Sequence, residues 1–347
     1  MTPLRIGLLG AARISDLAVL GPAHDAGHRL VAVAARDLER ARGWAHESGV
    51  ERVVPSYVDL VNDPEVDVVY NPLPNSLHAT WNVAAIKAGK HLLAEKPFAS
   101  NAAEAAVVRG VAAGSTNVVF EAFHYRYHPI FNRLLQVTTD GTIGPLQHLQ
   151  VTMSTPPPPD DDLRWSWPLA GGALMDLGCY AIHVIRSMAQ HQGGTPELIS
   201  AQAVERPGRP QVDESAHLEF RLPGGLPAIA DVTMDGAWDF TITATGASGS
   251  ASIANFINVH HDDRFTLQTA EGEHVEHLGR RSTYHYQMDA LSAAITDGQP
   301  FPTGVDDALS NMQMIDACYL AAGLRPRQGH LALPEAMADH TSVGEPH

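Results

Sequence analysis

Short apolar runs alternate with segments of helical periodicity over the first 120 residues. The helical segments are 12–24, 38–48, 76–88 and 101–113. The runs between them, rich in Val, Ile and Leu, are 5–9, 30–34, 66–70, 91–94 and 118–120. Continuous apolar strands joined by helices are typical of buried parallel strands with crossover connections. We therefore predict a doubly wound α/β domain of the Rossmann type over residues 1–122.

The pattern changes after residue 122, where strands begin to follow strands. Helices are expected at 129–137, 173–189, 284–297 and 304–322. β-branched runs separated by turn signals such as Pro223-Gly224-Gly225 predict strands at 146–154, 198–205, 215–222, 226–234, 239–245 and 249–254. This order predicts a second, α+β domain over 123–335 with a large, open, mainly antiparallel sheet and helices on one face. Residues 336–347 read as a polar tail.

Length and charge limit the class of protein. A chain of 347 residues is expected to form two domains. With 23 basic against 39 acidic residues, its net charge of −16 argues against nucleic acid or an anionic membrane surface as a partner. Two cysteines, Cys179 and Cys318, make no disulfide framework. We find neither a secretion signal nor 18 successive apolar residues, so we expect a cytoplasmic protein that spans no membrane.

The first strand-to-helix turn carries a degenerate dinucleotide-binding pattern. Such turns usually read Gly-x-Gly-x-x-Gly/Ala, which lets backbone N–H groups approach a pyrophosphate at a helix N-terminus. Here Gly10 is kept, while Ala12 and Ser15 stand at the other two positions. A plain strand–turn–helix is the alternative. We predict that the cofactor contacts Gly10, Ala11, Ala12, Arg13 and Ile14.

Arg36 stands at the tip of the second strand, where NAD-binding proteins usually have a ribose-binding acid. A guanidinium there suits the 2′-phosphate of NADP, because its planar fork matches phosphate oxygens. Arg40, one helical turn on, can add a second positive charge. Asp37 can instead bind the ribose or cap the helix. We predict NADP, with NAD less favoured.

Polar residues also follow the strands at 66–70 and 91–94, where open α/β sheets bind ligands. The segment Leu73-Pro74-Asn75 leads to His78, and Glu95-Lys96 precedes a proline. Read alone, these are a helix start and a loop. Because Lys96 directly follows an apolar strand, we predict that it belongs to the active site. We also assign it to the cofactor, together with Leu73, Pro74, Asn75, His78 and Glu95.

A largely apolar helix carries Asp176 and Tyr180, four residues apart and therefore on one face together with His183. An acid and a phenol on such a helix need partners. The plain alternative is a core helix whose polar groups are satisfied. The run His260-His261-Asp262-Asp263 lacks the spacing of a metal site, so we expect a polar turn and no metal.

In combination and in order, these motifs resemble the Gfo/Idh/MocA oxidoreductases, named for glucose–fructose oxidoreductase and inositol dehydrogenase. The resemblance covers residues 4–325 and includes Glu-Lys-Pro at 95–97, Glu-Ala-Phe at 121–123 and Gly-Gly-x-Leu-x-Asp-x-Gly-x-Tyr at 171–180. It implies an N-terminal Rossmann domain and a C-terminal open sheet often used for subunit contact. We therefore expect a homodimer or homotetramer.

Tyr180 stands where the inositol dehydrogenases of the family have histidine. The chain therefore resembles the branch with dihydrodiol dehydrogenase, D-xylose dehydrogenase, glucose–fructose oxidoreductase and nucleotide-sugar 3-ketoreductases, which commonly uses NADP. Two departures from the family pattern are His124, where methionine is common, and the Pro- and Asp-rich loop 155–162. Both are expected near a carbohydrate-like substrate.

The expected reaction is hydride transfer between a carbinol carbon and nicotinamide, with proton transfer at the oxygen. We expect Tyr180 to be the acid/base, its pKa lowered by the Lys96 cation and the oxidised nicotinamide. Lys96 can instead be the base. Asp176 would hold the substrate or Lys96, and Arg164 would bind the cofactor or close the site. Weaker candidates for the substrate wall are Tyr125, Trp165, His183 and Tyr284. A ketosugar reductase and an NADP-sensing regulator without turnover are the alternatives.

Overall fold

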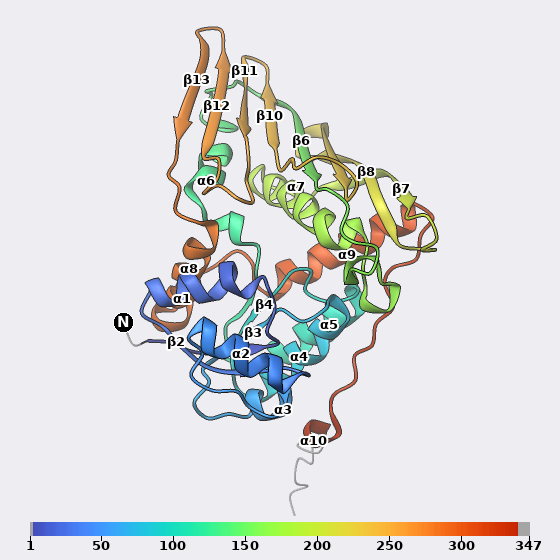
Figure 1. Ribbon diagram of the computed structural model, residues 1–347. Coiled ribbons are helices and arrows are strands. Elements are labelled where there is room, and N and C mark those ends of the chain that lie inside the picture. Colours follow the sequence, from blue (N-terminus) through green and yellow to red (C-terminus); the bar gives the residue numbers. More distant parts are fainter. Residues whose placement is uncertain (1–2, 339–347) are drawn as a thin grey trace, which may run out of the picture.

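The computed structural model describes residues 3–338, which form two sheets with helices around and between them (Figure 1). In the N-terminal half, five strands pair in parallel in the order β2-β1-β3-β4-β5. Their bounds are β1 Arg5–Leu9, β2 Arg29–Ala34, β3 Val68–Asn71, β4 His91–Ala94 and β5 Val119–Glu121. The helices between them include α2 Leu38–Ser48, α4 Asn75–Lys87 and α5 Ala102–Ala112. The predicted doubly wound Rossmann domain is confirmed.

The N-terminal helices differ from the prediction in two places. The helix expected at 12–24 begins only with the π-helical turn η1 Asp16–Leu20 and continues as the short α1 Gly21–Asp25. Residues 11–14 stay outside the helix, which leaves the first strand-to-helix turn open. A short helix, α3 Tyr57–Val61, was not expected, because five residues give too little periodicity to detect.

The C-terminal sheet has eight strands in the order β13-β12-β11-β10-β6-β9-β8-β7. Among these strands the β6–β9 pair is parallel and the other pairs are antiparallel. The bounds are β6 Leu146–Ser154, β7 Glu197–Glu205, β8 Asp213–Leu222, β9 Leu226–Thr233, β10 Ile242–Gly246, β11 Gly249–Ile253, β12 Arg264–Thr269 and β13 Gly272–His277. The large open sheet was predicted correctly, apart from β12 and β13.

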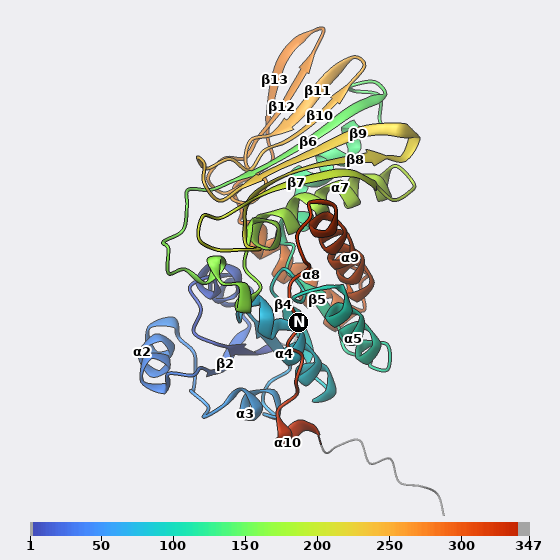
Figure 2. The same ribbon diagram turned by 90° about the vertical axis from the view of Figure 1, so that its right-hand side faces the viewer.

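One face of this sheet is covered by helices, and the other is open. Helices α7 Cys179–His191 and α6 Pro129–Val137 contact the sheet from the covered side, and α9 Val305–Ala321 packs between β7 and α5 (Figure 2). Alternation in β9 shows the two faces: Ala228, Ala230 and Val232 are buried, while Ile229 and Asp231 are partly exposed. The apolar residues of the predicted alternating pattern therefore lie on the face of the sheet that the helices cover.

Two C-terminal segments return to the N-terminal half. Helix α8 Thr283–Asp297 packs on α1 and η1, where Met288 and Leu291 join the core cluster of β1. After α9 the chain runs back past α5 to α10 Glu335–Ala338 (Figure 2). Part of the tail predicted at 336–347 thus lies in α10, and residues 339–347 lie outside the described residues.

The apolar helix expected at 173–189 begins with a π-helical turn, η5 Leu174–Gly178, and continues as α7. Within residues 3–338, the stretch Trp167–His191 is the one that is long and apolar enough to cross a membrane by length and composition. Of its apolar window, 83% is buried inside the protein. The stretch is therefore placed as a core helix.

Candidate active site

A cavity of about 930 Å³ lies between the two halves of the molecule. The N-terminal half contributes the turns after β1 to β4, with Gly10, Arg36, Asn75 and Lys96. The loops and helices of the C-terminal half supply the opposite wall, including Tyr180. The carboxyl ends of parallel strands are the expected position for a ligand in an open α/β sheet.

The turn after β1 forms a cradle of free backbone N–H groups. Gly10 has φ +92°, a conformation that favours glycine, and its N–H donates to Ala34 O at 2.7 Å. The N–H groups of residues 11–14, which line the cavity, form no hydrogen bond within the described chain. Free N–H groups at this turn are what a pyrophosphate requires, so the residues present fit a dinucleotide cofactor.

The two arginines after β2 differ in their surroundings. Arg36 is exposed, lines the cavity and pairs with no other residue between 3 and 338. Arg40 also lines the cavity, and its Nη2 donates to Ala11 O at 2.9 Å, which braces the N–H cradle. Asp37 accepts from Arg40 N at 3.0 Å as the N-cap of α2. Of the two roles left open for Asp37, the structure shows the cap.

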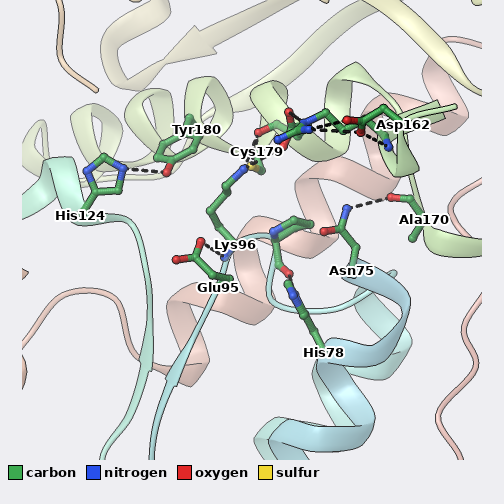
Figure 3. A network of polar contacts seen from close by, with 12 residues as sticks. Asn75, His78, Glu95, Lys96, His124, Asp162, Ala170, Cys179 and Tyr180 are labelled. Atoms are coloured by element: carbon green, nitrogen blue, oxygen red, sulfur yellow. Dashed lines mark hydrogen bonds and ion pairs between the residues drawn. The ribbon is translucent and has the colours of Figure 1, made fainter. Parts of the chain in front are cut away.

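The Leu73–Asn75 loop and His78 position the next part of the wall. His78 is buried, with its ring nitrogens 2.7 Å from Pro97 O and 2.6 Å from Leu73 O. Asn75 donates to Ala170 O at 2.9 Å, which links this loop to the C-terminal half (Figure 3). These residues and Pro74 line the cavity, and the His78 ring links the loop at Leu73 to the one at Pro97.

Lys96 and Arg164 both pair with one carboxylate, that of Asp176. Lys96 Nζ lies 3.1 Å from Asp176 Oδ1 and 2.9 Å from the Asp176 carbonyl oxygen, and Arg164 Nε lies 2.8 Å from Oδ2. Burial raises the pKa of Asp176, but the two cations outweigh it and lower the pKa to about 2. Burial likewise disfavours the Lys96 ammonium, yet Asp176 holds its pKa above the usual value. The site therefore presents a fixed cation at neutral pH.

Glu95 directly precedes Lys96. It is buried, accepts from Tyr70 Oη at 2.9 Å, and its carboxylate lies 3.3 Å from Lys96 N. Burial raises the pKa of Glu95. Glu95 lines the cavity directly before Lys96.

Tyr180 lines the cavity next to Lys96, but its hydroxyl has a different partner. Lys96 Nζ lies 5.1 Å from the centre of the Tyr180 ring, over its face. The hydroxyl lies 2.9 Å from Nε2 of His124 (Figure 3). Burial raises the pKa of Tyr180 well above 10. The net lowering expected for this pKa is thus not met in the protein alone, because burial of the phenol raises it, and Tyr284, Glu95, Cys179 and Asp176 add to the rise.

The substrate-wall candidates separate into two groups. Tyr284 lines the cavity, and its hydroxyl bonds to no described residue. Tyr125, His183 and Trp165 are buried outside the cavity lining and are therefore not wall residues. Tyr125 Oη lies 2.6 Å from His183 Nδ1, and His183 Nε2 lies 2.9 Å from Asp307. Those polar groups satisfy one another in the core, which is the plain alternative given above for such a helix.

Several residues of the wall were missed in the sequence. Tyr57 lies in the short helix α3, and the others stand singly in strands and loops of the C-terminal half, where nothing in the local pattern marks them. The loop 155–162, noted for its composition, does supply four prolines to the lining. The additional lining residues include Tyr57, Met153, Trp238, Phe240, Ile257 and Asn258.

Metal ligands do not gather in the described part of the chain: no group of three or more His, Cys, Asp or Glu residues is placed to hold an ion. His260 and His261 lie in a turn, their rings 4.1 Å apart. Asp263 is instead 2.9 Å from His277 Nδ1. The polar turn expected here is present.

Comparisons with known proteins agree with this geometry. Residues 4–123 match the family model described as an oxidoreductase family with an NAD-binding Rossmann fold, and residues 131–252 match the GFO/IDH/MocA C-terminal domain. An NADP-dependent D-xylose 1-dehydrogenase of Haloferax volcanii is 29% identical over 92% of this chain and 97% of its own length. The trans-1,2-dihydrobenzene-1,2-diol dehydrogenase of Sus scrofa is 31% identical over 78% of this chain and 82% of its own.

A solved structure shares the whole architecture. It is a 3-ketoreductase from Actinomadura kijaniata in complex with NADP and TDP-benzene, similar with a TM-score of 0.85 and 25% identity over 92% of this chain and 98% of that one. Both family models together cover more than half of the chain, and the two sheets described above are the ones they require. The chain belongs to the Gfo/Idh/MocA family of oxidoreductases.

Proposed function

We propose that this protein transfers a hydride between the nicotinamide of NADP and a carbinol or carbonyl carbon of a sugar, a glycoside or a related cyclic polyol. The observation that carries the proposal is one cavity that joins the free N–H cradle at Gly10 to the cluster of Lys96, Asp176 and Tyr180. The cofactor supplies the hydride chemistry when bound. The protein supplies a proton carrier, a fixed cation and a wall for the substrate.

Each residue of the cluster has a distinct proposed role. Tyr180 exchanges the proton with the substrate oxygen, since its phenol lines the cavity beside Lys96. Lys96 offers an ammonium that stabilises negative charge on the substrate oxygen or on the tyrosinate. Asp176 holds Lys96 and Arg164 in place. The open alternative, Lys96 as the base, is disfavoured by the raised pKa of its ammonium.

The preference for NADP rests on Arg36. Its guanidinium faces the cavity at the end of β2 and pairs with no described residue, so it is free for a 2′-phosphate. Two of the relatives named above are described with NADP. The cofactor contacts proposed at residues 10–14 and at Arg40 belong to the same end of the cavity.

The charges of the wall favour an uncharged sugar over a nucleotide-linked one. Arg164 is the one cation that the second half contributes to the described lining, and Asp162 and Asp176 already pair with it. The rest of that wall is aromatic or apolar apart from the neutral polar groups of Thr155, Tyr180, Asn258 and Tyr284. Aromatic faces and neutral hydrogen-bonding groups suit polyhydroxylated rings. The ketosugar reductase remains the second candidate, favoured by the likeness to the 3-ketoreductase.

A substrate panel tests the proposal. Aldoses, glycosides and trans-diols are offered with NADP⁺, and nucleotide-linked ketosugars with NADPH, while the absorbance of the reduced nicotinamide is followed. We expect turnover of an uncharged sugar or diol. Turnover of the nucleotide-linked ketosugar alone would favour the reductase, and tight NADP binding without turnover of any substrate would favour a sensor.

We also propose a cytoplasmic homodimer or homotetramer. Within residues 3–338 both cysteines are free and buried, which is compatible with a reducing compartment. The open face of the eight-stranded sheet offers a surface that a second copy can cover symmetrically.

A further inference from the structure

His124 lies next to Tyr180, the proposed proton carrier, and each of its ring nitrogens has a partner. It lies in the 3-10 turn η2 His124–Tyr127, directly after β5, and is 1% exposed. Its Nε2 lies 2.9 Å from the Tyr180 hydroxyl and its Nδ1 lies 2.7 Å from Thr283 Oγ1. The Tyr284 ring lies against its ring, with centroids 3.9 Å apart. The imidazole is therefore held on three sides.

The partners determine which nitrogen carries the proton. The Thr283 hydroxyl donates to Ile257 O at 3.3 Å, so its oxygen is left to accept from Nδ1–H of His124. In a neutral imidazole the other nitrogen is then an acceptor. Burial, followed by the Lys96 cation, lowers the pKa of His124 to about 3, so the ring is neutral at physiological pH. Nε2 therefore accepts the hydroxyl proton of Tyr180.

We propose that His124 is a positioning residue for Tyr180: as the Nδ1–H tautomer it takes up the hydroxyl proton in a hydrogen bond, and so leaves the phenol oxygen as an acceptor toward the cavity. In this state a substrate hydroxyl can donate a hydrogen bond to the phenol oxygen, and oxidation proceeds once Tyr180 has lost its own proton to solvent, because only the tyrosinate can take the proton of the alcohol. In the reverse direction the phenol proton must turn from His124 to the carbonyl oxygen. The inference rests on the proposed role of Tyr180.

His124 orients the proton but does not carry it away. Accepting a net proton would make the ring an imidazolium, which burial opposes. The chain of hydrogen bonds then ends at Ile257 O, a carbonyl that cannot pass a proton on. The bond acts instead on the affinity of Tyr180 for its proton, because a hydrogen bond to the neutral phenol disfavours the tyrosinate.

Nuclear magnetic resonance of the full protein tests the tautomer directly. Long-range ¹H–¹⁵N correlation spectra of the histidine rings distinguish Nδ1–H, Nε2–H and imidazolium, and the His124 signals are assigned by their loss in His124→Met. We expect neutral Nδ1–H at neutral pH. We further expect Thr283→Val to move the ring toward Nε2–H and Thr283→Ser to keep Nδ1–H. An Nε2–H or imidazolium ring in the unaltered protein would overturn the inference.

A second readout follows the proton of Tyr180 through the pH profile of kcat/KM for oxidation. Losing the Thr283 hydroxyl frees the ring to donate to the phenol oxygen, so the apparent pKa should fall by about half to one pH unit in Thr283→Val. Thr283→Ser should restore the unaltered profile. The other groups that face Tyr180 stay the same in both variants: Lys96, Glu95, Asp176, Cys179 and Tyr284.

The outcomes separate this inference from the proposed function. If Tyr180→Phe retains turnover, the proposed role of Tyr180 fails, whereas the tautomer spectrum still decides the state of His124. If Tyr180→Phe loses turnover while both Thr283 variants share the unaltered pH profile, the role of His124 is purely structural and the inference is wrong.

Discussion

Arg36 is the residue on which the cofactor preference depends. Replacing it by aspartate removes a charge-assisted partner of the 2′-phosphate and supplies a ribose acid, so Arg36→Asp should bind NADP roughly ten- to a hundredfold more weakly and NAD more tightly. Titration calorimetry measures both affinities. Arg42→Asp, on α2 shortly after Arg36 but outside the described cavity lining, is the control and should change neither.

The unaltered protein must itself prefer NADP for this reading of Arg36 to hold. Equal affinity for NAD and NADP in the same titration would show that the free guanidinium does not meet the 2′-phosphate.

Single residues show why the sequence predicted part of the site and missed the rest. Lys96 follows a strand and Asp176 lies on an apolar helix, and both signals are local. The bond between His124 and Tyr180 joins residues 56 positions apart, and no local pattern encodes it. For the same reason Tyr125 and His183 read as wall candidates, although they satisfy each other in the core.

At the scale of elements, the Gly171-Gly172 turn has a steric reason. Gly172 has φ +124°, and a Cβ there would lie 2.1 Å from Asp213 Oδ1 and 2.3 Å from Arg327 Nη2. Asp213 and Arg327 form a fully buried ion pair, and Asp213 accepts from Leu174 N at the start of η5. Gly172→Ala should therefore lower the free energy of unfolding by about 3 to 5 kcal/mol, because it disrupts a buried pair in a packed site.

Urea unfolding followed by circular dichroism measures this loss. Gly193→Ala is the matched control: its φ is +84°, but nothing lies within 4 Å of the added Cβ. Only backbone strain applies there, which costs about 1 to 2 kcal/mol. Equal losses in the two variants would contradict the steric account of Gly172.

Most strands that are buried on one or both faces were predicted, whereas the exposed edge strand β13 was not. The strands of the N-terminal sheet are buried runs, and β8 and β9 alternate cleanly. β13, Gly272–His277, has Val275 as its one strongly apolar residue and is mostly exposed. An edge strand of this kind carries no alternation to detect. The helix expected at 12–24 was broken by the open turn that the cradle needs.

At the scale of the whole molecule, the hydrogen bonds and ion pairs that join distant segments of the chain could not be predicted from the sequence. Arg327, after α9, donates to Gly171 O at 2.6 Å and pairs with Asp213, while its own carbonyl accepts from Asn101 at 2.8 Å. The C-terminal segment thereby joins the loop before η5 to the start of α5. Contacts over 156 and 226 positions depend on the folded topology, not on local sequence.

The open sheet face leads to a prediction about assembly. Light scattering at micromolar concentration should give the mass of a dimer or tetramer. Ile229→Lys, on the open face of β9, should shift the protein toward the monomer, because it places a charge where a second copy would pack. Val107→Lys, at an exposed position of α5, is the control. A monomeric mass for the unaltered protein would count against the proposed assembly.

The effect of the Lys96 ammonium on the proton of Tyr180 can be tested by removing the lysine. Lys96→Ala should lower turnover by about a hundredfold and shift the rise of oxidation with pH to higher values, since an isolated phenol binds its proton more tightly than one beside a cation. Binding of NADP should stay within a few-fold. If the pH profile does not move, Lys96 does not act on the tyrosine.

Turnover of Tyr180→Phe at saturating substrate tests the central claim most directly. The variant deletes one hydroxyl and leaves the ring to pack against Phe123, so any loss reports on proton transfer. Turnover should fall by about a hundredfold or more, with NADP affinity within a few-fold of the unaltered protein. Tyr286→Phe, outside the described cavity lining, is the control and should keep full activity. Near-normal turnover in Tyr180→Phe would contradict the account and leave Lys96 as the base.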